Sequence, residues 1–257
     1  MTNPMNLSGH HIVVTGAAQG IGEAIARLSV DLGARVSLVD VQADRLQALG
    51  KELGSQKAKV FVGSVADPTF VQHMVDQSVE QLGPIHGLVN NAGIVRAAMI
   101  TKMSASVWQQ VIDVNLSGVF YCLQAVGRHM IDRLATGDPS AASIVNISSD
   151  AGRRGTIGQI NYGAAKSGVM GITMSAAREW AGHGVRVNSI CFGVVETEMT
   201  ETIRSEKFRD RIMAQVPMGR FSTPEEVSQP VAFLLSQASS YITGQHLSVN
   251  GGYTIGV

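Results

Sequence analysis

The sequence predicts a single α/β domain in which helices cover both faces of a seven-stranded parallel sheet. Two observations carry this prediction. Short runs of apolar and β-branched residues end at Gly, Asp, Asn or Ser, and segments of helical length separate them. Strands that alternate with helices along a whole chain are typical of a doubly wound sheet. The expected strands lie within residues 11–16, 34–40, 58–64, 86–93, 142–149, 185–193 and 246–252.

The segments between the strands have helical patterns and helix-capping residues. The expected helices span residues 22–32, 43–53, 69–82, 107–134 and 162–181. Asp67 followed by Pro68 is a typical helix start, and Thr223 with Glu226 forms a potential capping box. The chain has 257 residues, 45% of them hydrophobic, and no stretch that resembles a linker. We therefore expect one domain over residues 1–257.

Composition argues against several classes of partner. Twenty basic residues balance twenty acidic ones without a basic run, so neither nucleic acid nor an anionic membrane is an expected partner. Cys122 and Cys191 lie among apolar residues, as buried thiols do in a reducing compartment. No secretion signal and no long apolar run is present, and the histidines lack metal-ligand spacing. We expect a cytoplasmic protein without a metal site that acts on a small molecule.

A glycine-rich turn follows the first expected strand, in the segment from Thr15 to Gly22. Such a turn can hold a pyrophosphate on the first N–H groups of a helix, although any tight strand-to-helix turn also favours glycine. Asp40 ends the second strand, where a carboxylate can bind an adenosine ribose. It would repel a 2′-phosphate, and residues 41–43 contain no Arg or Lys, which favours NAD over NADP. The alternative role of Asp40 is an N-cap for the next helix.

Tyr162 and Lys166 are four residues apart in an expected helix and therefore share one face. A nearby ammonium favours the phenolate, so we expect Lys166 to lower the pKa of Tyr162 and allow it to exchange a proton with an alcohol or ketone. Ser149 lies thirteen residues before Tyr162, at the end of an apolar strand. Sites in open α/β sheets form at such strand ends, so its hydroxyl is placed to orient a substrate oxygen.

Four motifs together carry a family resemblance: TGAAQGIG at 15–22, NNAG at 90–93, NISS at 146–149 and YGAAK at 162–166. With them the chain resembles the short-chain dehydrogenase/reductase family along nearly its whole length. The resemblance implies a Rossmann fold and an active site of Asn115, Ser149, Tyr162 and Lys166. It further implies that Ser149 holds the substrate oxygen, Tyr162 transfers the proton, Lys166 bonds the nicotinamide ribose and tunes Tyr162, and Asn115 supports a water relay to Lys166.

The same resemblance implies a set of contacts to the NAD cofactor. They come from Gly16, Gln19, Gly20, Ile21, Gly22, Asp40, Ser64, Val65, Asn91, Ala92, Gly93, Tyr162, Lys166, Val195 and Thr197. Outside such a constellation, Asn115 is explained as a side chain that satisfies a helix kink or a backbone group, and Ser149 as part of a strand-end turn.

Two positions depart from the family pattern. Phe192 stands where the family usually has Pro, so the loop on the nicotinamide side can sit differently, and Phe192 is a candidate to pack on the nicotinamide. Ser64 stands where the family commonly has an Asp that contacts adenine, so that contact is either weaker or made by the Ser64 hydroxyl.

The segment at about 194–220 is the expected substrate lid. It carries apolar residues at helical spacings, interleaved with Glu and Arg, although packing of these residues on the core explains the pattern equally well. The apolar residues are Met199, Ile203, Phe208, Ile212 and Met213.

The expected function is that of an NAD(H)-dependent oxidoreductase that interconverts a secondary alcohol and a ketone. The segments GQINYGAAKSG, REW, ETEMT and AQVPMGR are most similar to the 3-oxoacyl-[acyl-carrier-protein] reductase branch, which typically uses NADPH. A 3-hydroxyacyl compound, a small alcohol and a polyol are all open as substrates. Arg153 and Arg154 are candidates to meet a substrate anion, or else form a solvated pair. The last helix and strand form subunit contacts in the family, commonly of a homotetramer.

An NADPH-dependent 3-oxoacyl-[acyl-carrier-protein] reductase stays open as an alternative function, and so do two further alternatives. One is a protein that senses the dinucleotide without chemistry, since a fold does not dictate function. The other is an epimerase or dehydratase of the extended family, but those chains usually carry an additional C-terminal substrate domain. Only short segments follow the sixth expected strand in this chain.

Overall fold

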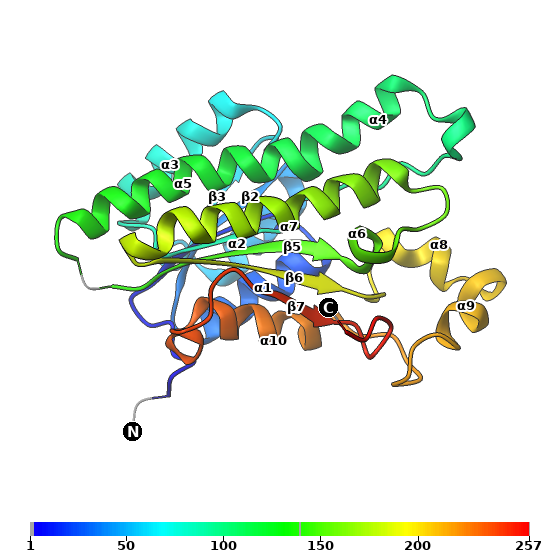
Figure 1. Ribbon diagram of the computed structural model, residues 1–257. Helices are drawn as coiled ribbons and strands as arrows, with labels where there is room; N and C mark the ends of the chain where they lie inside the picture. The colour runs from blue at the N-terminus through cyan, green and yellow to red at the C-terminus, as the bar shows by residue number, and fades with distance from the viewer. Residues whose placement is uncertain (1–2, 139, 257) are drawn as a thin grey trace.

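The computed structural model, which describes residues 3–138 and 140–256, contains the predicted sheet of seven parallel strands (Figure 1). The strand order is β3-β2-β1-β4-β5-β6-β7. All seven expected strands are present, which confirms the predicted fold class. Their bounds are β1 His11–Thr15, β2 Arg35–Asp40, β3 Ala58–Val62, β4 Gly87–Asn90, β5 Ala142–Ser149, β6 Val185–Phe192 and β7 His246–Val249.

The helices cover the sheet in two layers. Helices α1 (Gly20–Asp31), α2 (Ala43–Leu53) and α10 (Pro224–Leu235) pack on one face, where their apolar side chains form one buried cluster with the strands. Helices α3 (Pro68–Leu82), α5 (Gly118–Ala135) and α7 (Ile160–Trp180) cover the other face and form the second cluster. The predicted caps are present, because Asp67 accepts hydrogen bonds from Thr69 and Phe70, and Thr223 forms a capping box with Glu226.

One predicted helix is interrupted. The sequence predicts a continuous helix over 107–134, whereas the chain forms α4 (Ala105–Ile112), a wide π-helical turn at Asp113–Ser117, and then α5. A π-turn accommodates one extra residue and changes the direction of the side chains that it carries. Asn115 lies in this turn and is completely buried.

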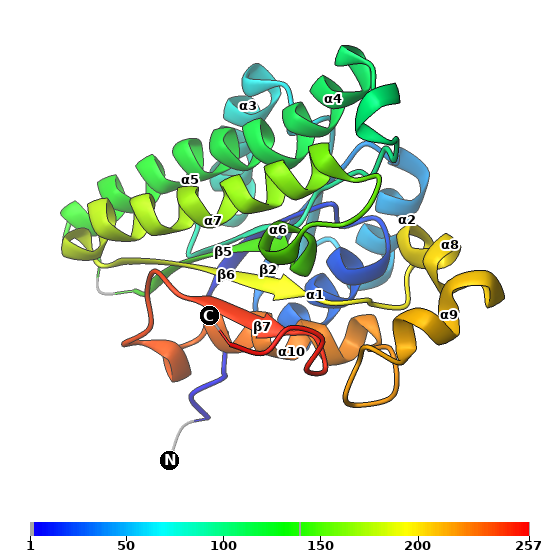
Figure 2. The same ribbon diagram turned by 45° about the vertical axis from the view of Figure 1, so that its right-hand side comes forward.

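Short helices lie around the carboxyl ends of the strands. They are η1 (Ile100–Lys102), α6 (Asp150–Arg154), η4 (Glu198–Thr200), α8 (Glu201–Arg204) and α9 (Glu206–Met213), while η3 (Ala181–His183) and η5 (Gln237–Ser239) follow α7 and α10. Figure 2 shows α8 and α9 extending beyond the sheet. Neither α8 nor α9 contains a fully buried residue, and the apolar residues Ile203, Phe208, Ile212 and Met213 on them are half-buried.

The topology fixes where a ligand can bind. Strands β1 to β3 are added toward one edge of the sheet and strands β4 to β7 toward the other, so the topological switch point lies between β1 and β4. Binding crevices of open α/β sheets lie beyond the carboxyl ends of the strands at such a point. Within the described residues, no helix has the length and apolar character needed to cross a bilayer.

Candidate functional site

The glycine-rich turn forms the first wall of the site. Gly16 and Gly20 have φ values of +66° and +58°, which side chains rarely tolerate. A Cβ at Gly16 would lie 2.8 Å from the Ala92 Cα, and one at Gly20 would lie 3.2 Å from the Thr197 Cγ2. Helix α1 begins at Gly20 without a side-chain cap from Gln19, which leaves its first N–H groups available to an anion.

Asn91 and Ala92 brace this turn from the end of β4. The Asn91 amide donates to the Thr15 carbonyl (3.0 Å) and the Gly16 carbonyl (3.1 Å). The backbone N–H groups of Asn91 and Ala92 both donate to the Thr15 hydroxyl at 3.0 Å. These contacts join the two strands at the switch point and hold the turn open toward the crevice.

Asp40 lies beside the turn at the end of β2. Its carboxylate accepts hydrogen bonds from Ala18 N–H (3.1 Å) and Gln42 N–H (3.0 Å). The alternative interpretation of Asp40 as the N-cap of the next helix is wrong, because the N-cap of α2 is Gln42. Asp40 instead positions the turn and the start of α2 while its carboxylate stays half-exposed.

Arg45 is a residue that the sequence analysis missed. Residues 41–43 carry no positive charge, but in the first turn of α2 the Arg45 guanidinium contacts the Gln19 side chain of the glycine-rich turn. It also forms an ion pair with Glu198 at 2.9 Å. A positive charge therefore does lie near the expected adenosine end of the crevice.

Ser64 and Val65 follow β3. The Ser64 hydroxyl accepts from Ala66 N–H at 3.2 Å and keeps its own proton to donate. Val65 is 6% exposed and packs against the backbone of Gly118.

On the opposite side of the crevice, Thr197 lies over Gly20, and its N–H donates to the Thr200 hydroxyl at 3.2 Å. Val195 is buried and forms an isolated bridge with Ser222. Phe192 is only 4% exposed and belongs to the cluster beneath α1 and α10, a placement that does not favour packing on a nicotinamide.

Ser149, Tyr162 and Lys166 meet at the carboxyl end of β5. The Ser149 hydroxyl accepts from Ala151 N–H at 3.2 Å and thereby caps α6. Tyr162 lies in the first turn of α7, and the Lys166 ammonium nitrogen lies 5.7 Å from the centre of the Tyr162 ring. The shared face that the spacing predicts is confirmed.

The protonation of this group differs from the expectation. Burial raises the pKa of Tyr162, and contact with the Ser149 hydroxyl lowers it by less. The prediction that Lys166 lowers the pKa of Tyr162 is therefore wrong for the protein without bound cofactor. The loss of hydration on burial opposes the phenolate more strongly than the neighbouring groups favour it. Burial likewise lowers the pKa of Lys166 to about 8.

Lys166 and Asn115 are both held by backbone groups. The Lys166 ammonium donates to the Ile147 carbonyl at 2.7 Å, and an ammonium has two further protons to donate. The Asn115 side chain accepts from Ile94 N–H (2.8 Å) and donates to the Ile94 carbonyl (2.9 Å). Gly93 lies beside the Asn115 amide, within ordinary contact distance.

Arg153 and Arg154 follow Ser149 on α6, where Arg153 is half-buried and Arg154 is exposed, and hydrogen bonds hold both side chains. Arg153 donates to the His246 carbonyl at 2.7 Å and to the Ser248 hydroxyl at 2.9 Å. Arg154 donates to the Tyr253 carbonyl at 3.0 Å and lies 4.0 Å above the ring of the same residue. Both arginines thus tie the helix after Ser149 to β7 and the C-terminal segment.

Known proteins are similar to this chain in both sequence and architecture. A sequence family described as enoyl-(acyl-carrier-protein) reductase matches residues 16–254. The chain is 42% identical to a 3-oxoacyl-[acyl-carrier-protein] reductase FabG of Thermotoga maritima, over 98% of this chain and 100% of that protein. It is 41% identical to an acetoacetyl-CoA reductase of Synechocystis sp., over 97% of this chain and 98% of that one.

The structural comparison agrees. A putative short-chain alcohol dehydrogenase from Sinorhizobium meliloti superposes with a TM-score of 0.91 at 32% identity, with 98% of each chain covered. The fold and the site thus define a nicotinamide-dinucleotide oxidoreductase that acts on alcohol and keto groups. The chain belongs to the short-chain dehydrogenase/reductase family and resembles its 3-oxoacyl-[acyl-carrier-protein] reductases.

Proposed function

We propose that this enzyme interconverts a secondary alcohol and a ketone with NAD(H), with Tyr162 as the proton-transfer group. The observation that carries the proposal is the convergence of Tyr162, Ser149 and Lys166 at the carboxyl end of β5. A bound nicotinamide supplies or accepts the hydride. In ketone reduction, Tyr162 gives its proton to the carbonyl oxygen while the Ser149 hydroxyl donates a hydrogen bond to the same oxygen.

The raised pKa of Tyr162 suits the reductive direction. A phenol held neutral by burial carries the proton that the developing alkoxide needs. The two unused protons of the Lys166 ammonium are available for a ribose hydroxyl and for the phenol oxygen. The Asn115 side chain is hydrogen-bonded to the backbone of Ile94. We therefore assign its proposed part in a water relay to the backbone of the π-turn.

The residues around the crevice fit a dinucleotide. The three glycines let the turn pack closely, since a Cβ at Gly16, Gly20 or Gly22 would meet Ala92, Thr197 or the Gly16 carbonyl, and the start of α1 offers free N–H groups. We assign the remaining cofactor contacts to Gln19, Ile21, Ser64, Val65, Asn91, Ala92, Gly93, Val195 and Thr197. The half-exposed carboxylate of Asp40 supports NAD, because it repels a 2′-phosphate.

The second candidate is an NADPH-dependent 3-oxoacyl-[acyl-carrier-protein] reductase. Two observations favour it: the relatives that carry this name, and the guanidinium of Arg45 beside Gln19. Titration of the wild type, Asp40→Asn and Arg45→Ala with NADH and NADPH separates the two candidates. We expect Asp40→Asn to shift preference toward NADPH by roughly tenfold or more. Tighter binding of NADPH to the wild type, weakened in Arg45→Ala, would favour the second candidate.

Exposed apolar side chains near Tyr162 support an acyl substrate. Ile157 is 81% exposed, Ile100 67% and Met99 56%. The segments that carry them are joined by the hydrogen bond from Ala98 N–H to the Gly158 carbonyl at 2.9 Å. We propose that this surface and the lid at about 194–220 cover the carbon chain of a 3-hydroxyacyl or 3-oxoacyl compound, with small alcohols and polyols as the alternative.

A panel of ketones and alcohols, each with NADH or NADPH and followed by nicotinamide absorbance at about 340 nm, tests the proposal. We expect turnover of acyl ketones with NADH. Binding of NADH without oxidation or reduction of any member would favour a dinucleotide sensor instead.

We also propose that the enzyme is a homotetramer in which β7 contributes to a subunit interface. This strand is an open edge of the sheet, and Leu247 on it is 38% exposed. Nearby, Tyr241 is fully exposed. Exposed edges with apolar side chains are usually covered in natural proteins. Light scattering would test the assignment, and a monomeric mass would contradict it.

A further inference from the structure

A fully buried asparagine lies directly before Tyr162. Asn161 has no exposed surface. Its side-chain oxygen accepts from Tyr162 N–H at 2.8 Å. That N–H belongs to the first turn of α7 and has no partner within the helix. The side chain of Asn161 therefore satisfies the backbone of the residue that the proposed function makes catalytic.

The amide nitrogen of Asn161 reaches away from α7. It donates to the Arg96 carbonyl at 3.0 Å and more weakly to the Val107 carbonyl in α4 at 3.4 Å. One side chain thus connects the start of α7 to two parts of the chain that lie 54 and 65 residues before it: helix α4, and residues 94–98, which we call the flanking segment.

Alternate residues of the flanking segment are held by this part of the molecule. Ile94 bonds to Asn115 through both its N–H and its carbonyl, Arg96 to Asn161, and Ala98 to Gly158. Asn115 and the residue before Tyr162 lie on different helices, and both form hydrogen bonds to the backbone of the flanking segment. A change at Asn161 would release Tyr162 from that segment while leaving the glycine-rich turn intact.

We infer that Asn161 is a positioning residue that sets the place of the Tyr162 hydroxyl relative to Asn115 and the flanking segment. The inference rests on the proposed function, since it assigns Asn161 to the proton-transfer step. Misplacement of a reacting group by about 1 Å lowers rates by roughly 10²-fold. Removing the Asn161 amide should therefore lower kcat and have little effect on cofactor binding.

The chain offers a matched control in Asn188. It is also fully buried, donates to the Ile242 carbonyl at 2.9 Å, and accepts from Gln245 N–H at 3.0 Å. It lies on β6 and holds the loop before β7, with no contact to the Tyr162 group. Asn188→Ala thus removes a similar set of buried hydrogen bonds at a distance from the chemistry.

The test measures kcat, the KM for ketone, the NADH dissociation constant and the solvent deuterium isotope effect on kcat. For Asn161→Ala and the milder Asn161→Ser we expect kcat to fall by roughly 10–100-fold, with KM and NADH affinity within about threefold of the wild type. The solvent isotope effect should rise because proton transfer becomes slower. Asn188→Ala should leave kcat and the isotope effect near the wild-type values, even if it lowers the melting temperature as much as the Asn161 variants do.

If the wild type is active and the Asn161 and Asn188 variants change kcat and the isotope effect equally, the inference is overturned but the proposed function is not. Failure of both Asn161 variants to fold would overturn it too, since Asn161 would then be a stability residue. A wild type that binds NADH but turns over no alcohol or ketone would overturn the proposed function and the inference with it.

Discussion

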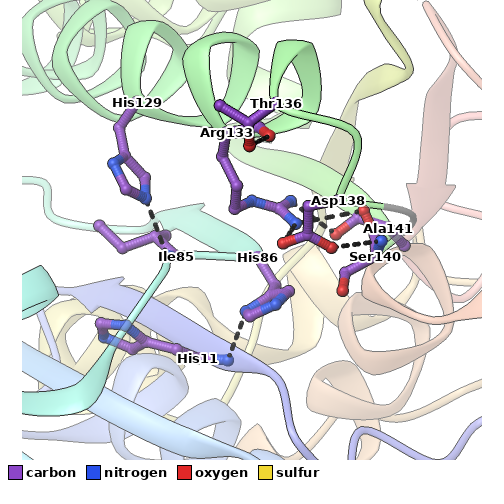
Figure 3. A network of polar contacts seen from close by, with 9 residues as sticks. All are labelled: His11, Ile85, His86, His129, Arg133, Thr136, Asp138, Ser140 and Ala141. Atoms are coloured by element: carbon purple, nitrogen blue, oxygen red, sulfur yellow. Dashed lines mark hydrogen bonds and ion pairs between the residues drawn. The ribbon is translucent and has the colours of Figure 1, made fainter.

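Mild acid should destabilise this protein through histidines at the amino ends of β1 and β4, opposite the crevice. His11 is fully buried and His86 is 8% exposed. Figure 3 shows His86 beside Arg133 and Asp138, together with His11 and His129. His86 Nδ1 accepts from His11 N–H at 3.1 Å, and His129 Nε2 accepts from Ile85 N–H at 3.1 Å. Each of these nitrogens must stay unprotonated to accept.

The other contacts favour neutral rings as well. His11 Nδ1 lies 2.7 Å from the Gly83 carbonyl and Nε2 lies 2.8 Å from the Ser37 hydroxyl, which fits one donor and one acceptor nitrogen. Burial lowers the pKa of both His11 and His86 to about 4, and nearby Arg133 adds to the effect on His86. His10 stacks on His86 with ring centres 5.2 Å apart, which places another ionisable ring against it.

The size of the effect follows from proton linkage. Between pH 6.5 and 4 the unfolded chain binds protons at these histidines and the folded chain does not, so stability falls as the pH decreases. With a pKa of about 4 in the folded state and about 6.5 in the unfolded state, one histidine costs about 2 kcal/mol at about pH 5. Below the folded pKa the loss stops growing.

The assay is urea unfolding at about pH 7.5 and about pH 5 for the wild type, His86→Asn and the exposed-site control His183→Gln. An Asn oxygen can replace His86 Nδ1 as acceptor but does not titrate. We expect the stability difference between the two pH values to be smaller by about 2 kcal/mol in His86→Asn and unchanged in His183→Gln. The same pH difference in all three proteins would refute the reasoning.

Two further substitutions test the crevice. Gly16→Ala places a side chain at a φ of +66° and 2.8 Å from the Ala92 Cα, so calorimetry should record NADH binding weakened by about tenfold or more; unchanged affinity would contradict the proposed phosphate site. Lys166→Met should lower kcat by roughly 100-fold or more. It should change the unfolding midpoint little, because the wild-type ammonium loses its hydration on burial and methionine does not bear that cost. A variant with wild-type kcat would show that Lys166 has no part in the proton step.

The fold was predictable because its elements depend on local patterns. Runs such as 142–149 and 185–193 are too apolar for loops and too short for helices, and the alternation with helices leaves few arrangements other than a doubly wound sheet. The pairing of Tyr162 with Lys166 follows from helical spacing, and the place of Ser149 follows from the strand that ends there.

What escaped prediction depends on contacts distant in sequence. Helical periodicity does not reveal that Asn115 bonds to Ile94, so the π-turn was missed. The pKa of Tyr162 follows burial, which a list of neighbouring charges does not reveal. The partners of Arg153 lie 93 and 95 residues away.

The most direct test of the account is single-turnover reduction of a ketone by Tyr162→Phe, combined with calorimetric titration of NADH. Phenylalanine keeps the ring and removes the hydroxyl group that carries the transferred proton. We expect hydride transfer to fall by roughly 10²–10⁴-fold while the NADH dissociation constant stays within about threefold of the wild type. Undiminished hydride transfer in this variant would contradict the assignment of Tyr162 as the proton-transfer group.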